Sequence, residues 1–191
     1  MNSEQHQDKQ QAQYHEVLDD HGHKTGQIAD RETVHTQELW HEVVNVWVIS
    51  TKGEVLLQLR APEAELSPNV WDVAIGTHVR PGEEPVAAAV RCLHTELGVD
   101  ILPDQLNHLF NLQSVNPLPA GKHHNVLCHV FLLKRDLDIA TITIDERKIA
   151  RLEWRALPAL ISDVGSAGQF MPRGGAYYPQ LFDALTQQIG L

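Results

Sequence analysis

Cysteine, long apolar runs and positive charge are all scarce in this chain. Its two cysteines, Cys92 and Cys128, are too few for a disulfide framework. No apolar segment approaches the roughly 20 residues that a transmembrane helix needs. Lys and Arg total 15 against 25 Asp and Glu, the formal charge is -10, and no basic run appears. We therefore expect a protein that binds neither membranes nor nucleic acid.

The rest of the composition is that of an ordinary globular domain. The 191 residues are 42% hydrophobic and 21% charged, which is enough for one sizeable core. Residues 1–13 are polar and rich in glutamine, without an apolar core or a cleavage-like site, so we expect a mobile tail and not a signal peptide. Residues 14–191 would then form a single domain, located in the cytoplasm.

A strand, a glycine-bearing loop and a helix are predicted within residues 71–100. Alternating apolar residues over 71–75 indicate a half-buried strand, which Gly76 and the turn after it would end. Pro85 suits the first turn of a helix, and Gly98 suits its C-terminal end. Apolar residues at helical spacing predict the face that packs on the core: Val86, Val90, Leu93 and Leu97. An ordinary amphipathic helix would also explain this pattern.

This loop and helix resemble the Nudix box, in which a glycine and a glutamate precede a helical Arg-Glu-aliphatic-any-Glu-Glu-any-Gly-aliphatic run. The register rests on six residues: Glu83, Arg91, Leu93, Glu96, Gly98 and Val99. In that family the box carboxylates bind divalent cations, usually magnesium, which polarise a diphosphate for attack by water. Here Thr77 stands at the box glycine, and Cys92 and Thr95 replace two acidic residues. Two of the three anionic ligands that magnesium prefers are therefore replaced.

A second resemblance extends over roughly residues 14–187. The successive segments VH, LWH, VNVWVI, GEVLLQLR, WDVA and GTHV are similar to the Nudix subgroup related to type 1 isopentenyl-diphosphate isomerase. In that isomerase three histidines and two glutamates bind a divalent metal, and a cysteine and a glutamate transfer protons. Gly76 stands at the cysteine, and His124 and Val126 stand at the glutamates. The resemblance places metal ligands at three histidines: His35, His41 and His78.

These histidines have two possible roles. Imidazole is a common ligand of zinc, manganese and iron at neutral pH, so the three could form a metal site, which His124 could join. The chain has 12 histidines, however, and each of these could instead be a surface or hydrogen-bonded residue. The sequence leaves both interpretations open.

We predict an α/β fold, a Nudix-like α/β/α sandwich with a mixed sheet between the box helix and a C-terminal helix. The first functional hypothesis is a hydrolase of a small nucleoside or isoprenoid diphosphate that depends on magnesium or manganese. Glu83 and Glu96 would bind the metal with the three histidines, Arg91 would orient Glu83, and Glu96 or the metal would activate water. Three residues are assigned to substrate binding: Arg60, Trp71 and Lys122.

Two other hypotheses stay open. The chain could be a binding or regulatory domain that kept the Nudix fold but lost the metal cluster. It could also be an isomerase-like protein for isopentenyl diphosphate that lacks the usual acid and base. In each case the expected partner is a small-molecule diphosphate, and the chain could form a homodimer.

Overall fold

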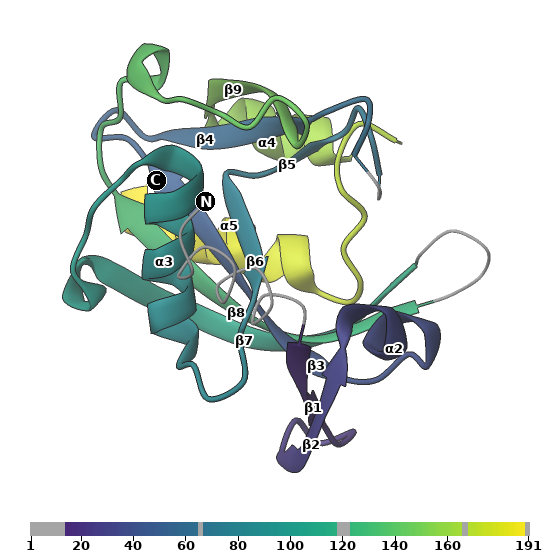
Figure 1. Cartoon of the computed structure of the whole chain (residues 1–191). Coiled ribbons are helices and arrows are strands. Elements are labelled where there is room, and N and C mark those ends of the chain that lie inside the picture. The colour runs from purple at the N-terminus through teal and green to yellow at the C-terminus, as the bar shows by residue number, and fades with distance from the viewer. Residues whose placement is uncertain (1–13, 65–66, 118–122, 166–167, 190–191) are drawn as a thin grey trace.

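The computed structural model describes residues 14–64, 67–117, 123–165 and 168–189. The predicted tail at 1–13 and Lys122 lie outside this part of the chain. A seven-stranded mixed sheet forms its centre (Figure 1). The strands are β3 (His41–Ile49), β4 (Glu54–Arg60), β5 (Trp71–Val73), β6 (Ile75–His78), β7 (Leu106–Pro117), β8 (His123–Lys134) and β9 (Ile149–Ala156).

β3 is the strand on which the sheet is built. Its residues are almost all buried, as expected for a strand covered on both faces. Along one edge it pairs in parallel with β8 over its whole length. Along the other edge it pairs first with β6, over residues 43–46, and then with β4, at Val48 and Ile49. The sheet therefore divides beyond β3, with β6 at one end of β3 and β4 at the other.

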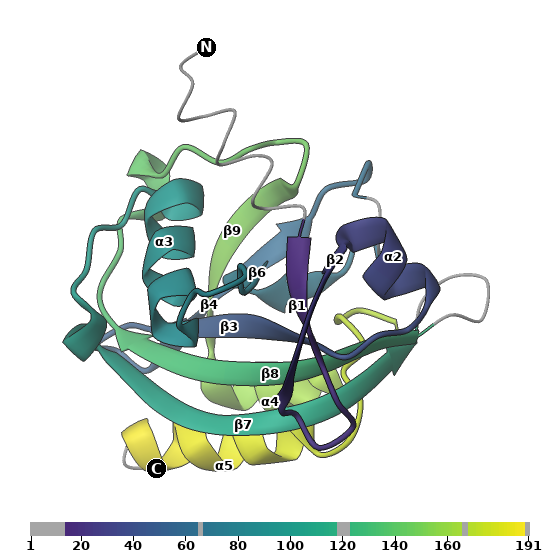
Figure 2. The ribbon, with the colours of Figure 1, turned by 60° about the horizontal axis from the view of Figure 1, so that its bottom comes forward.

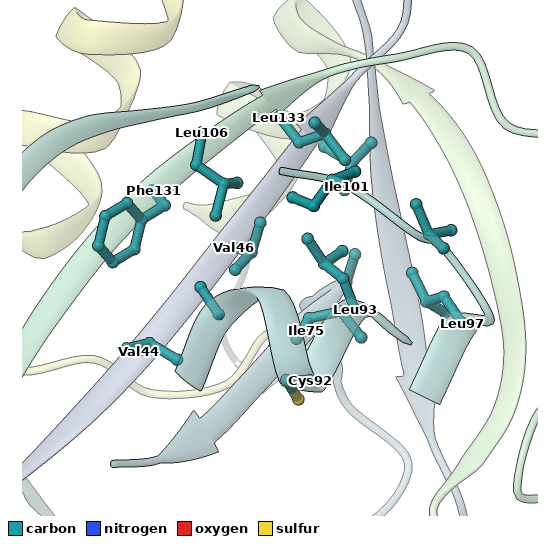
Figure 3. Close-up of a cluster of buried hydrophobic side chains, with 14 of the residues drawn as sticks. Val44, Val46, Ile75, Cys92, Leu93, Leu97, Ile101, Leu106, Phe131 and Leu133 are labelled. Carbon is teal, nitrogen blue, oxygen red and sulfur yellow. The ribbon is translucent and has the colours of Figure 1, made fainter. Parts of the chain in front are cut away.

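Helices cover both faces of the sheet, as Figure 2 shows. α3 (Pro85–Leu97) lies on one face, where it packs on Val44, Val46 and Ile75; Figure 3 shows this hydrophobic cluster. α4 (Leu157–Val164) and α5 (Tyr177–Ile189) cover the other face. The predicted α/β/α sandwich with a mixed sheet is confirmed. No helix in the described ranges is long and apolar enough to cross a membrane.

The bounds of α3 follow from its terminal residues. Pro85 occupies the first turn, where no hydrogen bond from its nitrogen is needed. Gly98 caps the other end in the left-handed conformation, with φ of 65°, and its N–H bonds to the His94 carbonyl. The predicted helix is confirmed at both ends.

The strand predicted over 71–75 is wrong in its extent. Two short strands replace it: β5 pairs with β4, and β6 continues through Gly76 to His78 along β3. Gly76 does not end the strand, because it pairs there with Asn45. A Cβ at Gly76 would come within 3.0 Å of the Asn45 Oδ1 atom, so the glycine permits a close approach of β6 to β3.

The N-terminal hairpin forms a sheet of its own, of strands β1 (Tyr14–Leu18) and β2 (Lys24–Asp30). The short helix α2 (Arg31–Thr36) follows directly, and the Asp30 carboxylate caps it by accepting from the Thr33 N–H at 2.9 Å. Leu18 bonds through its N–H to the Trp40 carbonyl at 2.8 Å. This bond and the burial of Val34 hold the hairpin and α2 against the start of β3 (Figure 2).

Candidate metal centre

Four histidines from distant segments bring their ring nitrogens together at the start of β3. His35 lies in the last turn of α2, His41 begins β3, His78 ends β6, and His124 is the second residue of β8. One ring nitrogen of each lies within 4.8 Å of the chosen nitrogens of the other three. In the part of the chain that the structure describes, no other group of three or more His, Cys, Asp or Glu side chains is placed to hold a metal ion.

The register of the sheet explains why three of these side chains meet. His78 is the cross-strand partner of Val43, which lies two residues after His41 and therefore on the same face of β3. His41 is the partner of Val126, which lies two residues after His124 in β8. Side chains alternate between faces along a strand, so the three histidines share one face.

Hydrogen bonding fixes the orientation of the His41 ring. Its Nδ1 lies 2.9 Å from the Leu39 carbonyl oxygen, which can only accept, so Nδ1 carries the proton. The lone pair is then on Nε2, which lies 2.9 Å from Nε2 of His124. The Nε2 of His78 is buried and has no hydrogen-bond partner among the described residues. The lone pair of His41 and the unbonded nitrogen of His78 are therefore both available to a metal at this cluster.

Three of the four rings have pKa values far enough below 7 to be neutral at that pH. Burial, with a smaller contribution from the neighbouring rings, lowers the pKa of His41 to about 3 and that of His124 to about 2. The same causes lower the pKa of His78 well below its usual value. A neutral imidazole is the form that binds a metal, so the low pKa values keep these ligands available in acid as well.

The four histidines fit a transition metal such as zinc and do not fit magnesium. Zinc accepts four nitrogen ligands in a tetrahedron, whereas magnesium prefers oxygen. Zinc–nitrogen bonds of about 2.1 Å would place the nitrogens roughly 3.4 Å apart. The widest separation here is 4.8 Å, so a contraction of a little over 1 Å would bring the four nitrogens to bonding distance.

Glu83 of the Nudix box is held by Arg91. The guanidinium donates two hydrogen bonds to this carboxylate, at 2.7 and 2.8 Å, and the Arg80 N–H donates a third at 3.0 Å. Burial alone would raise the pKa of Glu83, but these donors lower it below its usual value. Arg91 also donates to the His78 carbonyl at 3.2 Å, which connects the box to the histidine cluster through the backbone.

Glu96 faces a lysine where the Nudix box would place further carboxylates. Burial raises the pKa of Glu96, and the Lys148 ammonium, 3.6 Å away, partly offsets this. Burial also raises the pKa of the Cys92 thiol far above its usual value, so Cys92 stays protonated. Thr95 donates its hydroxyl to the Cys92 carbonyl at 3.3 Å. The box helix therefore offers one carboxylate, with a cation beside it.

Two of the residues assigned to substrate binding lie among ion pairs. The Arg60 guanidinium is 3.5 Å from the Asp72 carboxylate. Trp71 has the Arg155 guanidinium 4.6 Å from its ring centroid, so a cation covers one ring face. These contacts give both side chains structural partners, and their assignment to substrate binding stays a prediction.

Sequence reasoning missed His15 and the ion pair between Asp72 and Arg173. His15 is 1% exposed and lies against His41 and His78. The alternation of residues 14–18 could have indicated this position, because it places His15 on the same inward face as Val17. Arg173 contacts Asp72 at 2.5 Å across 101 residues of sequence, and nothing local in the sequence indicates that pairing.

The chain belongs to the Nudix family, because the NUDIX domain model matches residues 39–174. It is 31% identical over 177 residues to an isopentenyl-diphosphate Delta-isomerase of Paenarthrobacter aurescens, covering 88% of this chain and 90% of that protein. It is 28% identical to an uncharacterized Nudix hydrolase of Clostridium acetobutylicum, covering 64% and 60%. The fold matches the crystal structure of DR0079 from Deinococcus radiodurans with a TM-score of 0.66 at 20% identity, covering 91% and 98%. The family inferred from the box is confirmed.

Proposed function

We propose that this protein hydrolyses a small diphosphate with a transition-metal ion held by the four histidines. The observation that carries the proposal is the convergence of four imidazoles within 4.8 Å, from four separate elements. When bound with a coordination position open beyond the histidines, such an ion would polarise a phosphoryl oxygen and make bound water more acidic. The cluster contains the three histidines of the predicted set together with His124, the possible fourth member, and the two box glutamates are not part of it.

The chemistry of the chain favours hydrolysis over allylic isomerisation. Isomerisation needs one side chain that donates a proton to carbon and another that removes a proton from carbon. Gly76 and Val126, which stand at those positions, can do neither. The two cysteines do not replace them, because burial raises the pKa of Cys128 to about 12 and that of Cys92 further still. Hydrolysis needs only a polarised phosphoryl group and an activated water, which a single metal centre can provide.

The surroundings of the cluster suit an anionic substrate. Arg31, the first residue of α2, places a positive charge near enough to lower the pKa values of His41, His78 and His124. A cation near a metal centre attracts phosphate groups. The half-buried pair of Glu83 and Arg91 holds the box loop in place beside His78.

Metal content and turnover, measured on matched variants, test this proposal. The wild-type protein, expressed with zinc, manganese and iron supplied, is analysed for bound metal and for phosphate release from a panel of diphosphates that includes isopentenyl diphosphate. We expect His78→Ala to lose both metal and turnover, and Glu96→Gln to keep the metal. A folded wild-type protein without transition metal, or magnesium-dependent turnover that survives His78→Ala and is lost in Glu96→Gln, would overturn the proposal.

Two further outcomes identify the alternative functions. Bound metal and tight diphosphate binding without turnover on any panel member would identify a binding domain. Proton exchange at the allylic carbons of isopentenyl diphosphate would identify isomerase-like chemistry. Each of these results contradicts hydrolysis as proposed, while the metal analysis still reports separately on the four-histidine centre.

A further inference from the structure

His15 is a fifth histidine at the same centre, although it comes from the separate N-terminal sheet. Its ring centroid lies 4.5 Å from that of His78 and 5.4 Å from that of His41. The six pairs among the four proposed ligands are 4.8 to 5.7 Å apart by the same measure. His15 is therefore as close to two of the ligands as the ligands are to one another.

Both ring nitrogens of His15 are buried, and neither has a hydrogen-bond partner among the described residues. The Val79 carbonyl lies near the ring but forms no hydrogen bond of acceptable geometry with it. Leaving a buried polar atom unbonded is unfavourable, and an apolar side chain of similar size would avoid this at β1. The position therefore suits a histidine whose partner is an ion or a bound molecule.

We propose that His15 is a fifth ligand of the metal held by His35, His41, His78 and His124, an inference that rests on the proposed metal centre. With metal–nitrogen bonds of about 2.1 Å, ring centroids of two imidazoles on one ion lie roughly 4.5 Å apart at a 90° angle and about 5.3 Å apart at a tetrahedral angle. The separations of His15 from His78 and His41 are close to these two values. The ring nitrogens of His15 lie outside the group of four that falls within 4.8 Å, so binding would have to bring this ring closer to the ion.

This assignment gives the N-terminal unit a role in the site. The hairpin and α2 have a small hydrophobic cluster of their own, made of Val17, Ala29 and Val34 with Leu39 against it. His15 on β1 and His35 on α2 would tie this unit to β3, β6 and β8 through the ion. Metal binding would then stabilise the unit by the free energy of binding that these two ligands contribute.

Zinc affinity of the full chain tests His15 directly. Metal-free wild type, His15→Leu, His78→Ala and the control His21→Ala are titrated with zinc against a competing chelator; His21 lies in the exposed turn of the same hairpin. We expect His15→Leu to bind zinc roughly 10- to 100-fold more weakly, by analogy with the loss of an ordering partner at a metal site. We expect His78→Ala to lose more, and His21→Ala to match the wild type.

Two readouts separate a ligand from a packing residue. Leucine removes two unbonded nitrogens, so the melting temperature of metal-free His15→Leu should equal or exceed that of the wild type, while its increase on adding zinc should be smaller. The visible spectrum of the cobalt-substituted protein should also change, because the coordination number falls. If the leucine variant does not fold, His15→Gln replaces it, with the same expected loss of affinity.

The outcomes distinguish this inference from the proposed function. Wild-type zinc affinity and an unchanged cobalt spectrum in the His15 variant, together with loss of binding in His78→Ala, would overturn His15 as a ligand and leave the four-histidine centre standing. A folded wild-type protein that binds no zinc would overturn the centre itself.

Discussion

The metal-free protein should lose stability steeply as the pH falls from 7 to 5. Its buried histidines are neutral in the folded state, with pKa values lowered by burial and by one another: about 4 for His15, about 3 for His41 and about 2 for His124. In the unfolded chain the same rings have a pKa of 6.5. Below that pH the unfolded state binds protons that the folded state does not, so acid favours unfolding.

The size of the effect follows from the pKa differences. From pH 6.5 to 5, a span of about 1.5 pH units, each of these histidines lowers the free energy of unfolding by roughly 1.36 kcal/mol per unit, or about 2 kcal/mol. His15, His41 and His124 together cost about 6 kcal/mol, and His78 acts in the same direction. A domain of this kind has roughly 5–15 kcal/mol of net stability, so the loss should bring it near to unfolding. Above about pH 6.5 these rings are largely neutral in both states, so their contribution to the free energy of unfolding is fully present.

Urea denaturation at a series of pH values, followed by tryptophan fluorescence, measures this loss. The protein is freed of metal with a chelator, and each transition gives the free energy of unfolding. His15→Leu should remove about 2 kcal/mol of the loss between pH 7 and 5, since one titrating group is gone. His21→Ala, a change at an exposed histidine, serves as the control. Equal free energies of unfolding at pH 7 and pH 5 in the wild type would refute the reasoning.

Three further predictions concern the fold. Asp72→Ala leaves the largely buried Arg173 guanidinium without its 2.5 Å partner, and should cost about 3–5 kcal/mol in chemical denaturation; a cost under about 1 kcal/mol would contradict a buried pair. Gly98→Ala places a Cβ at φ of 65° and should cost about 1 kcal/mol by thermal denaturation, with no change expected if the residue were not the helix cap. Leu181→Ala should cost about 2–5 kcal/mol because this side chain is fully buried, whereas Leu102→Ala, at an exposed leucine, should cost under about 0.5 kcal/mol.

Much of the fold could be predicted because its signals are local. The box helix is marked by Pro85 and Gly98, whose backbone preferences act within one turn of the helix, and both ends agree with the structure. Helix α2 was not predicted, because its six residues contain one buried apolar side chain and so show no periodicity. The division into β5 and β6 was missed because it depends on which strand each segment pairs with, and pairing is a long-range property.

The candidate site could be predicted only where the family resemblance reached. His35, His41 and His78 were placed at metal positions by that resemblance, and His124 was left as an open fourth candidate. His15 lies outside those positions, and its proximity to His78 depends on how the separate hairpin docks on the main sheet. The pairing of Glu96 with Lys148 likewise joins α3 to the segment before β9, and no spacing within the sequence indicates it.

The measurement that tests the account most directly is X-ray absorption at the metal edge of the purified, metal-loaded protein. The account predicts a first shell of nitrogen atoms with the outer-shell scattering of several imidazoles, lost together with the metal in His78→Ala. A first shell of oxygen with a sulfur contribution, unchanged in His78→Ala and altered in Glu96→Gln, would place the metal at the Nudix box and contradict the four-histidine centre.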